Sequence, residues 1–134
     1  MKKNNNFINI KKKQKFFSII TVVLNNDKYL EKTIKSVINQ KSKNFEYIII
    51  DGGSKDSSLE IIKKYKNKIN YFVSEKDNGI YDAFNKGMKI ARGKFICIVN
   101  SDDILKNNAL SIIKNYIDQN PKIDFIFGSV KKHW

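Results

Sequence analysis

Residues 45–54 have the sequence FEYIIIDGGS, and this stretch decides the fold class. An isoleucine-rich apolar run is typical of a strand that is buried on both faces of a sheet. An aspartate, two glycines and a serine follow directly, a composition that ends a strand and begins a loop. A buried strand that leads straight into a polar turn is the first part of a βα unit, so residues 45–54 predict an α/β protein.

Apolar runs of similar length recur along the chain, at residues 16–24, 69–73, 95–99 and 125–127. Apolar residues also recur at helical spacing in four segments between these runs, at residues 29–38, 59–65, 81–90 and 110–117. Pro121 follows the last of these segments and predicts the end of that helix. Strands that alternate with helices predict an open, mostly parallel sheet of five strands flanked by four crossover helices.

At 134 residues the chain has the length of one domain, with 41% hydrophobic and 12% aromatic residues, as is ordinary for a globular protein. Residues 1–15 are polar and basic apart from a short apolar island at residues 7–10. We therefore expect a flexible basic extension over residues 1–15 and one folded domain over residues 16–134. Cys97 is the single cysteine, and its place in an apolar run predicts a small buried side chain without a disulfide inside the chain.

The formal net charge of +13 is large for a chain of this size. Taken alone, it fits nucleic acid, an anionic membrane face or phosphorylated ligands as partners, and equally a lysine-rich solvated surface. No stretch reaches the roughly 18 apolar residues of a membrane span, and no apolar run follows the basic start as in a secretion signal. We expect a cytoplasmic protein whose membrane contact, where present, is peripheral and at the inner face.

Polar clusters follow each of the first four expected strands, at residues 25–27, 51–54, 74–77 and 100–103. In a parallel sheet with right-handed crossovers these strand ends share one edge, where ligands of open α/β folds bind. Several of the clustered residues are carboxylates, and hard oxygen ligands suit Mg²⁺ or Mn²⁺ held jointly with substrate phosphates. The pattern therefore predicts a site for a phosphorylated ligand and a divalent cation at this edge.

The acidic residues of these clusters have a simpler structural explanation as well. Asp27 and Asp56 precede expected helices, and we interpret both as helix caps. Asp102 and Asp103 differ, because two adjacent carboxylates repel each other unless a cation or strong donors compensate. One of them could instead cap a helix that begins near Leu105.

Several common catalytic patterns are missing from the sequence. Gly52 and Gly53 permit positive φ or a close backbone approach, but neither G-x-G-x-x-G nor the P-loop pattern occurs. These absences argue against a dinucleotide enzyme and a P-loop kinase. His133 is the single histidine, so the chain can assemble neither a Ser/His/Asp triad nor a His/Cys metal cluster.

Four segments in sequence order resemble the donor-binding region of family 2 glycosyltransferases, the inverting enzymes of the GT-A fold. Residues 17–25, with the helix end at residues 36–40, begin the match. Residues 46–58 are similar to the family's strand followed by D-G-x-S-x-D-x-S/T, and residues 74–87 resemble a subgroup that carries G-I-Y-D-A-x-N-K-G. Residues 93–103 resemble the strand that ends in the family's D-x-D-type metal site.

The resemblance implies a GT-A domain that transfers a sugar, with inversion, from a UDP-sugar to a glycan or lipid-linked acceptor. It places the end of the first strand along the nucleoside and Asp51 against the uracil ring. The residues that it assigns to the nucleotide-sugar are Thr21, Val23, Asn25, Asp51, Asp82, Asn85, Ser101 and Asp102. Asp82 also fits a solvated helix charge.

The resemblance further implies that Asp102 binds the Mn²⁺ or Mg²⁺ ion that bridges the diphosphate, with Asp103 beside it. Asn100 departs from the family pattern, because many members have the first aspartate of D-x-D at that position. A related N-S-D-D form occurs in the subgroup, so Asp102 is expected to carry the coordination.

A catalytic base is harder to assign than the donor site. In the resembled family it is a carboxylate that follows the metal strand, whereas Asp118 and Asp124 are the only later acids and read as surface residues. We expect the base beyond Trp134 and the acceptor-binding half to be absent from this chain. The alternatives are a non-catalytic nucleotide-sugar-binding fragment, a nucleotidyltransferase relative and a basic nucleic-acid-binding domain. The last is disfavoured, and no nucleic-acid partner is expected, because the aromatic residues fall at core positions of the expected helices and strands.

Overall fold

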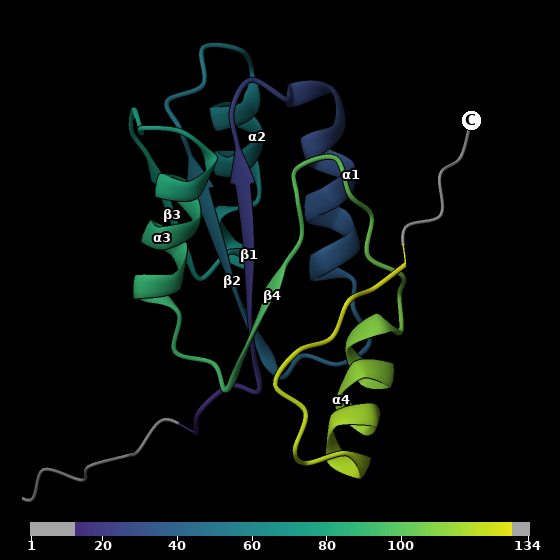
Figure 1. Ribbon diagram of the computed structural model, residues 1–134. Helices are drawn as coiled ribbons and strands as arrows, with labels where there is room; N and C mark the ends of the chain where they lie inside the picture. Colours follow the sequence, from purple (N-terminus) through teal and green to yellow (C-terminus); the bar gives the residue numbers. More distant parts are fainter. Residues whose placement is uncertain (1–12, 130–134) are drawn as a thin grey trace, which may run out of the picture.

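The protein is built around a parallel sheet of four strands in the order β3-β2-β1-β4 (Figure 1). The computed structural model describes residues 13–129. The strands are β1 (Phe17–Val23), β2 (Phe45–Asp51), β3 (Tyr71–Ser74) and β4 (Phe95–Ile98). Each lies within or beside an apolar run of the sequence, so the first four expected strands and their parallel arrangement are confirmed.

Four helices connect and follow these strands, together with one short 3-10 turn. They are α1 (Asp27–Ile38), α2 (Ser58–Lys64), η1 (Lys66–Lys68), α3 (Ile80–Ile90) and α4 (Ala109–Gln119). The bounds agree with the expected helical segments, and α4 ends before Pro121, as predicted. Each helix buries an apolar stripe, which is where most helix stability in a protein arises.

The central strands are buried on both faces, which explains their nearly continuous apolar sequence. Every residue of β1 is buried. On one face, Ile19 and Ile49 pack in a core with residues of α1, α2 and α4. On the other face, Ile20 and Ile50 pack against Ala83 of α3. Burial of each such side chain contributes about 1.5–3 kcal/mol, so the two layers together fix the position of the sheet edge.

The expected fifth strand does not form within the described residues. Residues 125–127 make no ladder, and Phe125 and Phe127 are 77% and 87% exposed. Their rings stand 5.3 Å apart, and the segment lies along Ile112 and Tyr116 of α4. An apolar run becomes a strand only where a partner accepts its backbone hydrogen bonds, and residues 125–127 have no such partner in this part of the chain.

Two further expectations need correction. No helix begins near Leu105, because residues 104–106 have no regular structure and α4 starts at Ala109. The expectation that the aromatic residues lie in the core is wrong for several of them. Besides the two phenylalanines above, the large exposed aromatic side chains are Tyr29, Tyr71, Tyr81 and Tyr116.

Strand β4 lies at the edge of the sheet and is less covered than the others. Ile96 and Ile98 on its α3-side face are 46% and 48% exposed. Cys97 points to the opposite face, where it packs against the larger core, and its burial raises the pKa of the thiol to about 11. Within residues 13–129, no helix combines the length and the apolar character needed to cross a bilayer.

Gly93, just before β4, tests how tightly the β1–β4 pair is packed. A Cβ atom at this position would lie 2.5 Å from the backbone carbon of Phe17 and from the backbone nitrogen of Ser18. We expect Gly93→Ala to lower the free energy of unfolding by about 1–3 kcal/mol, because backbone atoms cannot move aside as a side chain can. Urea denaturation measures the change.

Gly128→Ala is the matched control, because a Cβ atom at Gly128 would have no neighbour within 4 Å. Equal stability of the two variants would contradict the close approach of β4 to β1.

Candidate functional site

The polar clusters at the strand ends meet at one edge of the sheet, as the parallel topology requires (Figure 1). We call this edge the rim and define it as residues 24–27, 51–58, 74–82 and 99–103. The rim carries most of the acidic residues of the chain: Asp27, Asp51, Asp56, Glu75, Asp77, Asp82, Asp102 and Asp103. Its exposed apolar side chains are Leu24, Ile80 and Tyr81.

Asn25 joins the loops that follow β1 and β2. Its backbone N–H donates to Ser54 Oγ at 2.8 Å, and its side-chain oxygen accepts from the backbone N–H of Lys55 at 2.7 Å. The residue has φ = +50°, a conformation that asparagine tolerates better than most side chains. The two loops therefore hold each other through both the backbone and the side chain of one residue.

Asp27 and Asp56 cap helices across the same junction. The carboxylate of Asp27 accepts from the backbone N–H of Ser57 at 3.2 Å, while that of Asp56 accepts from the backbone N–H of Asp27 at 3.0 Å. Asp56 also accepts from the N–H of Ser58 at 2.9 Å, and hydrogen bonds of this kind lower its pKa against the opposing effect of burial. Asp56 thus satisfies an N–H at the start of the helix that follows it, as predicted. The prediction is wrong for Asp27, which is the first residue of α1 and accepts from the start of α2 instead.

Asn26 connects this pair of loops to the loop that follows β4. Its side-chain nitrogen donates to Ser101 Oγ at 2.9 Å, and its backbone N–H donates to Ser58 Oγ at 3.2 Å. Ser101 is thereby held next to the start of α1. The hydrogen bond of Ser101 therefore also restricts the position of the next residue, Asp102.

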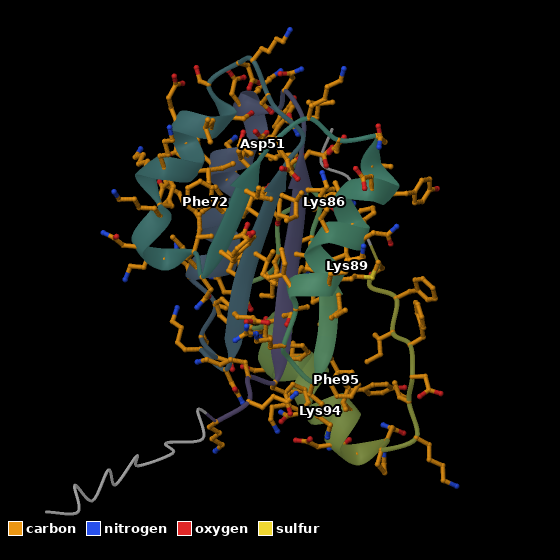
Figure 2. The ribbon with its side chains drawn as sticks, turned by 90° about the vertical axis from the view of Figure 1, so that its left-hand side faces the viewer. Asp51, Phe72, Lys86, Lys89, Lys94 and Phe95 are labelled. Atoms are coloured by element: carbon orange, nitrogen blue, oxygen red, sulfur yellow. The ribbon has the colours of Figure 1, made fainter. Side chains whose placement is uncertain are left out.

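Asp51 is completely buried at the end of β2, near the upper end of the sheet in Figure 2. Its carboxylate accepts from Ser54, through both the backbone N–H at 3.2 Å and the hydroxyl, and from Ser74 Oγ at 2.5 Å. Its backbone oxygen accepts from the N–H of Glu75 at 3.0 Å. Burial of a carboxylate is costly unless donors compensate it, and here three donors from two loops do so.

The glycines that follow Asp51 allow the neighbouring loop to come close. A Cβ atom on Gly52 would lie 2.6 Å from the carboxylate of Asp77, and one on Gly53 would lie 3.1 Å from the backbone nitrogen of Lys76. Gly53 also has φ = +83°. Both predicted reasons for this pair, positive φ and close approach, are confirmed, and the approach brings the loop after β3 against the loop after β2.

Lys86 of α3 supplies a positive charge at the rim (Figure 2). Its ammonium nitrogen lies 3.0 Å from Glu75 and 3.4 Å from Asp82, and the interaction with Glu75 raises the pKa of Lys86. Asp82 also accepts from the backbone N–H of Asn78 at 3.0 Å, and this hydrogen bond lowers its pKa. The side chain of Asp82 is half-buried and bound by Lys86 and Asn78, so it is not the solvated helix charge that the sequence also allowed.

Asp102 and Asp103 differ in their surroundings. The side chain of Asp103 is half-buried and accepts from the side-chain nitrogen of Asn100 at 3.1 Å, while its backbone N–H donates to the oxygen of Asn100 at 3.0 Å. Asp102 is exposed, and within residues 13–129 its carboxylate has no hydrogen bond or ion pair. The same part of the chain contains no preformed group of three metal-binding side chains.

The structure thus brings most of the predicted residues to the rim but leaves two inside the sheet. Thr21 is buried, with its hydroxyl 3.1 Å from that of Tyr47, and Val23 is buried with its carbonyl bound by the N–H of Gly52. Asn85 is exposed on α3. Contact of these residues with a nucleotide-sugar stays a prediction.

Four residues that hold the rim together were not predicted from the sequence: Asn26, Ser54, Ser74 and Lys86. A serine that follows a buried strand was a usable signal for Ser54 and Ser74, since such hydroxyls commonly satisfy a neighbouring carboxylate or helix end. Nothing in the sequence alone indicated that Asn26 would reach Ser101, which is 75 residues away.

An open parallel sheet with acidic and polar side chains collected at its carboxyl edge defines the class of open α/β proteins, whose ligands bind at that edge. The particular family follows from comparison. Residues 18–133 match the family model for glycosyl transferase family 2. The chain belongs to this family.

Named relatives agree with this membership. The chain is 37% identical over 116 residues to the poly(ribitol-phosphate) beta-N-acetylglucosaminyltransferase TarP of Staphylococcus aureus, covering 83% of this chain and 35% of that protein. It is 31% identical over 115 residues to glycosyltransferase GlyG of Streptococcus pneumoniae, covering 84% and 38%. The chain therefore spans little more than a third of the length of these curated relatives.

A solved structure supports the fold assignment. The crystal structure of S. aureus TarS 1-349 in complex with UDP-GlcNAc superimposes with a TM-score of 0.70 at 30% identity, over 77% of this chain and 31% of that chain. The expected GT-A fold is confirmed, and the chain corresponds to part of the length of relatives that are named glycosyltransferases.

The Asp51 cluster can be tested through stability. Asp51→Ala leaves donors of Ser54 and Ser74 unpaired, so we expect the free energy of unfolding to fall by about 1–3 kcal/mol. Ser74→Ala should cost less, and the double variant should lose less than the sum of the two, because both remove the same hydrogen bond. Urea denaturation of the four proteins completes the cycle.

Asp124→Ala serves as the control, because Asp124 is exposed and has no hydrogen bond or ion pair among the described residues. Strict additivity of Asp51→Ala and Ser74→Ala would contradict the direct contact between the two side chains.

Proposed function

We propose that this chain binds a UDP-sugar and a divalent cation at the rim, as the donor-binding part of an enzyme that transfers the sugar to a glycan or lipid-linked acceptor with inversion. The observation that carries the proposal is Asp102, a carboxylate that is exposed at the end of β4 and has no partner in the described part of the chain. It stands in a loop that Ser101 anchors to Asn26. An unpaired carboxylate in an anchored loop is a suitable ligand for a cation.

The charge of the rim supports a cation. A nucleotide diphosphate that approaches this acidic edge meets repulsion unless a positive ion lies between the two. Asp102 and Asp103 offer hard oxygen ligands that suit Mg²⁺ or Mn²⁺, and two carboxylates leave positions for diphosphate oxygens and water. When bound, the cation neutralises charge on the diphosphate leaving group.

The remaining contacts would come from the chain itself. The exposed side chains of Asn25 and Asn85 can hydrogen-bond the donor, and Tyr81, one turn before Asn85 on α3 and 81% exposed, offers an aromatic face. The side chains of Ser101 and Asp82 are already bound by Asn26 and by Lys86 with Asn78, so they hold the loops that surround the donor. Thr21 and Val23 support the same edge from within the sheet.

Asp51 is the proposed acceptor for the uracil N–H. Its oxygens already accept from Ser54 and Ser74, but a serine hydroxyl can rotate away and give up its place to the base. The UDP-GlcNAc complex of the similar TarS structure supports uracil as the base for this chain. The general base that deprotonates the acceptor is proposed to lie outside the residues described here, since Asp118 is paired with Lys114 and Asp124 lies away from the rim.

Metal-dependent binding is the first test. Calorimetry of the 134-residue chain with UDP should show binding that requires Mn²⁺ or Mg²⁺. Asp102→Asn should weaken that binding by on the order of 10- to 100-fold, the usual effect of losing a contact to a charged group. Circular dichroism checks that the variant is folded.

Asp118→Asn is the matched control, because Asp118 is an exposed carboxylate on α4 that pairs with Lys114. UDP binding that is equally strong in Asp102→Asn and in the parent, with the cation present, removes Asp102 from the site.

Base selectivity is the second test. A site that hydrogen-bonds one polar edge discriminates against ligands that leave its groups unpaired, so the parent chain should prefer UDP to GDP and ADP. Asp51→Asn should weaken UDP binding and leave GDP and ADP binding nearly unchanged, so the preference for UDP falls. Competition between the three nucleotides measures both, and equal affinities in the parent would exclude recognition of uracil by Asp51.

A further inference from the structure

The end of the sheet opposite to the rim has a distinct composition. Four segments lead into the four strands there, at residues 13–15, 39–44, 65–70 and 91–94. They contain eight basic residues and no acidic residue: Lys13, Lys15, Lys41, Lys43, Lys66, Lys68, Arg92 and Lys94. We call this set the basic end. Because parallel strands share their amino ends, the eight charges gather at one side of the molecule.

None of these eight side chains forms an ion pair within residues 13–129, where the lysines in ion pairs are Lys35, Lys64, Lys86 and Lys114. All eight residues are exposed. Lys43 donates to the carbonyl of Ile38 at 2.5 Å and so satisfies the end of α1, and Lys15 donates to the carbonyl of Lys43 at 3.3 Å. The others hold their charges in solvent.

A hollow of about 400 Å³ lies within the basic end. Lys43 and Lys68 flank it, and the side-chain amides of Asn39, Asn67 and Asn70 complete its polar lining. No acidic residue lines the hollow, and ammonium and amide groups are donors for phosphate oxygens. The hollow has the size and the donors for a phosphate-bearing group.

The two ends of the sheet therefore carry opposite charge. Figure 2 shows Asp51 and Lys86 near the end that bears the rim and Lys94 near the other. The acids of the rim and the bases of the basic end make the domain a large dipole along the strand direction. An anionic surface would attract the basic end and leave the rim directed away from it.

We infer that the basic end is a docking surface for anionic phospholipid, on which the domain lies with its rim facing solution. Dispersed, exposed lysines on long flexible stems suit a lipid surface, where each contributes independently to attraction by the anionic headgroups. The hollow between Lys43 and Lys68 would take one headgroup phosphate. This inference does not rest on the proposed sugar transfer.

The aromatic residues at this end favour lipid over nucleic acid. Single-stranded nucleic acid binds to basic surfaces through aromatic rings on which bases stack. Phe16, Phe45, Tyr65 and Phe95 lie at the basic end and are half-buried against the core. Tyr71 at the start of β3 is 43% exposed, so the described residues of this end offer a single open ring for stacking. Lys94 lies 5.9 Å and Lys114 lies 4.9 Å from the centre of the Phe16 ring, which further restricts access to it.

The test is co-sedimentation of the 134-residue chain with phosphatidylcholine vesicles that contain or lack phosphatidylglycerol. Binding should require phosphatidylglycerol and fall steeply between about 0.1 M and about 0.5 M salt. A variant with Lys41, Lys43, Lys66 and Lys68 changed to Gln should bind roughly 1,000-fold more weakly, from a contribution of about 1 kcal/mol for each lysine near an anionic surface.

The control variant has Lys28, Lys32, Lys55 and Lys76 changed to Gln, which removes the same charge from exposed positions away from the basic end. It should bind nearly as the parent does, and thermal melts check the folding of both variants. Equal loss in the two variants would show that net charge alone drives binding and would overturn the inference. So would failure of the parent to bind the anionic vesicles, or tighter binding of single-stranded RNA through the same four lysines. UDP binding measured on the parent and on the variant of Lys41, Lys43, Lys66 and Lys68 keeps this result separate from the proposed function, because none of these four lysines lies in the rim.

Discussion

The buried carboxylate of Asp51 is the interaction on which the arrangement of the rim depends. It ends the central strand β2 in a place with no access to water, so it must be satisfied by the protein. Ser54 closes the turn after β2 around it, and Ser74 brings the end of β3 to the same point. One charged group therefore fixes two loops, and the small residues Gly52 and Gly53 are the condition that lets those loops come close enough.

The rest of the rim is held by similar exchanges between loops. Asp27 and Asp56 each satisfy the start of the other's helix, and Asn26 fastens the loop after β4 to the start of α1. Such cross-links commit many polar side chains to structure. They distinguish the acids that satisfy donors of the protein from Asp102, which is exposed and has no partner within residues 13–129.

The opposite ends of the sheet divide the charge of the chain as well. The rim is acidic although the net charge of the chain is +13. The excess positive charge lies on the remainder of the surface, above all at the basic end. Because of this separation, the acidic rim would attract a cation and the basic end would attract an anionic surface. The docking of the basic end would leave the rim open to a soluble donor.

The sequence by itself determined the order of four strands and four helices, the shared edge of polar clusters and the family resemblance. These follow from local patterns, because isoleucine-rich runs form buried strands and the apolar stripes of the helices pack against those strands. Tertiary structure decided the rest. Residues 125–127 have the composition of a strand but no backbone partner, and Asp51, Asp82 and Asp102 look alike in sequence. They differ because Ser74, which is 23 residues further along the chain, donates to Asp51, whereas Asp82 is bound by Asn78 and Lys86 within its own segment and Asp102 has no donor among the described residues. The contact of Asp51 with Ser74 is set by the packing of β3 beside β2, which no local pattern encodes.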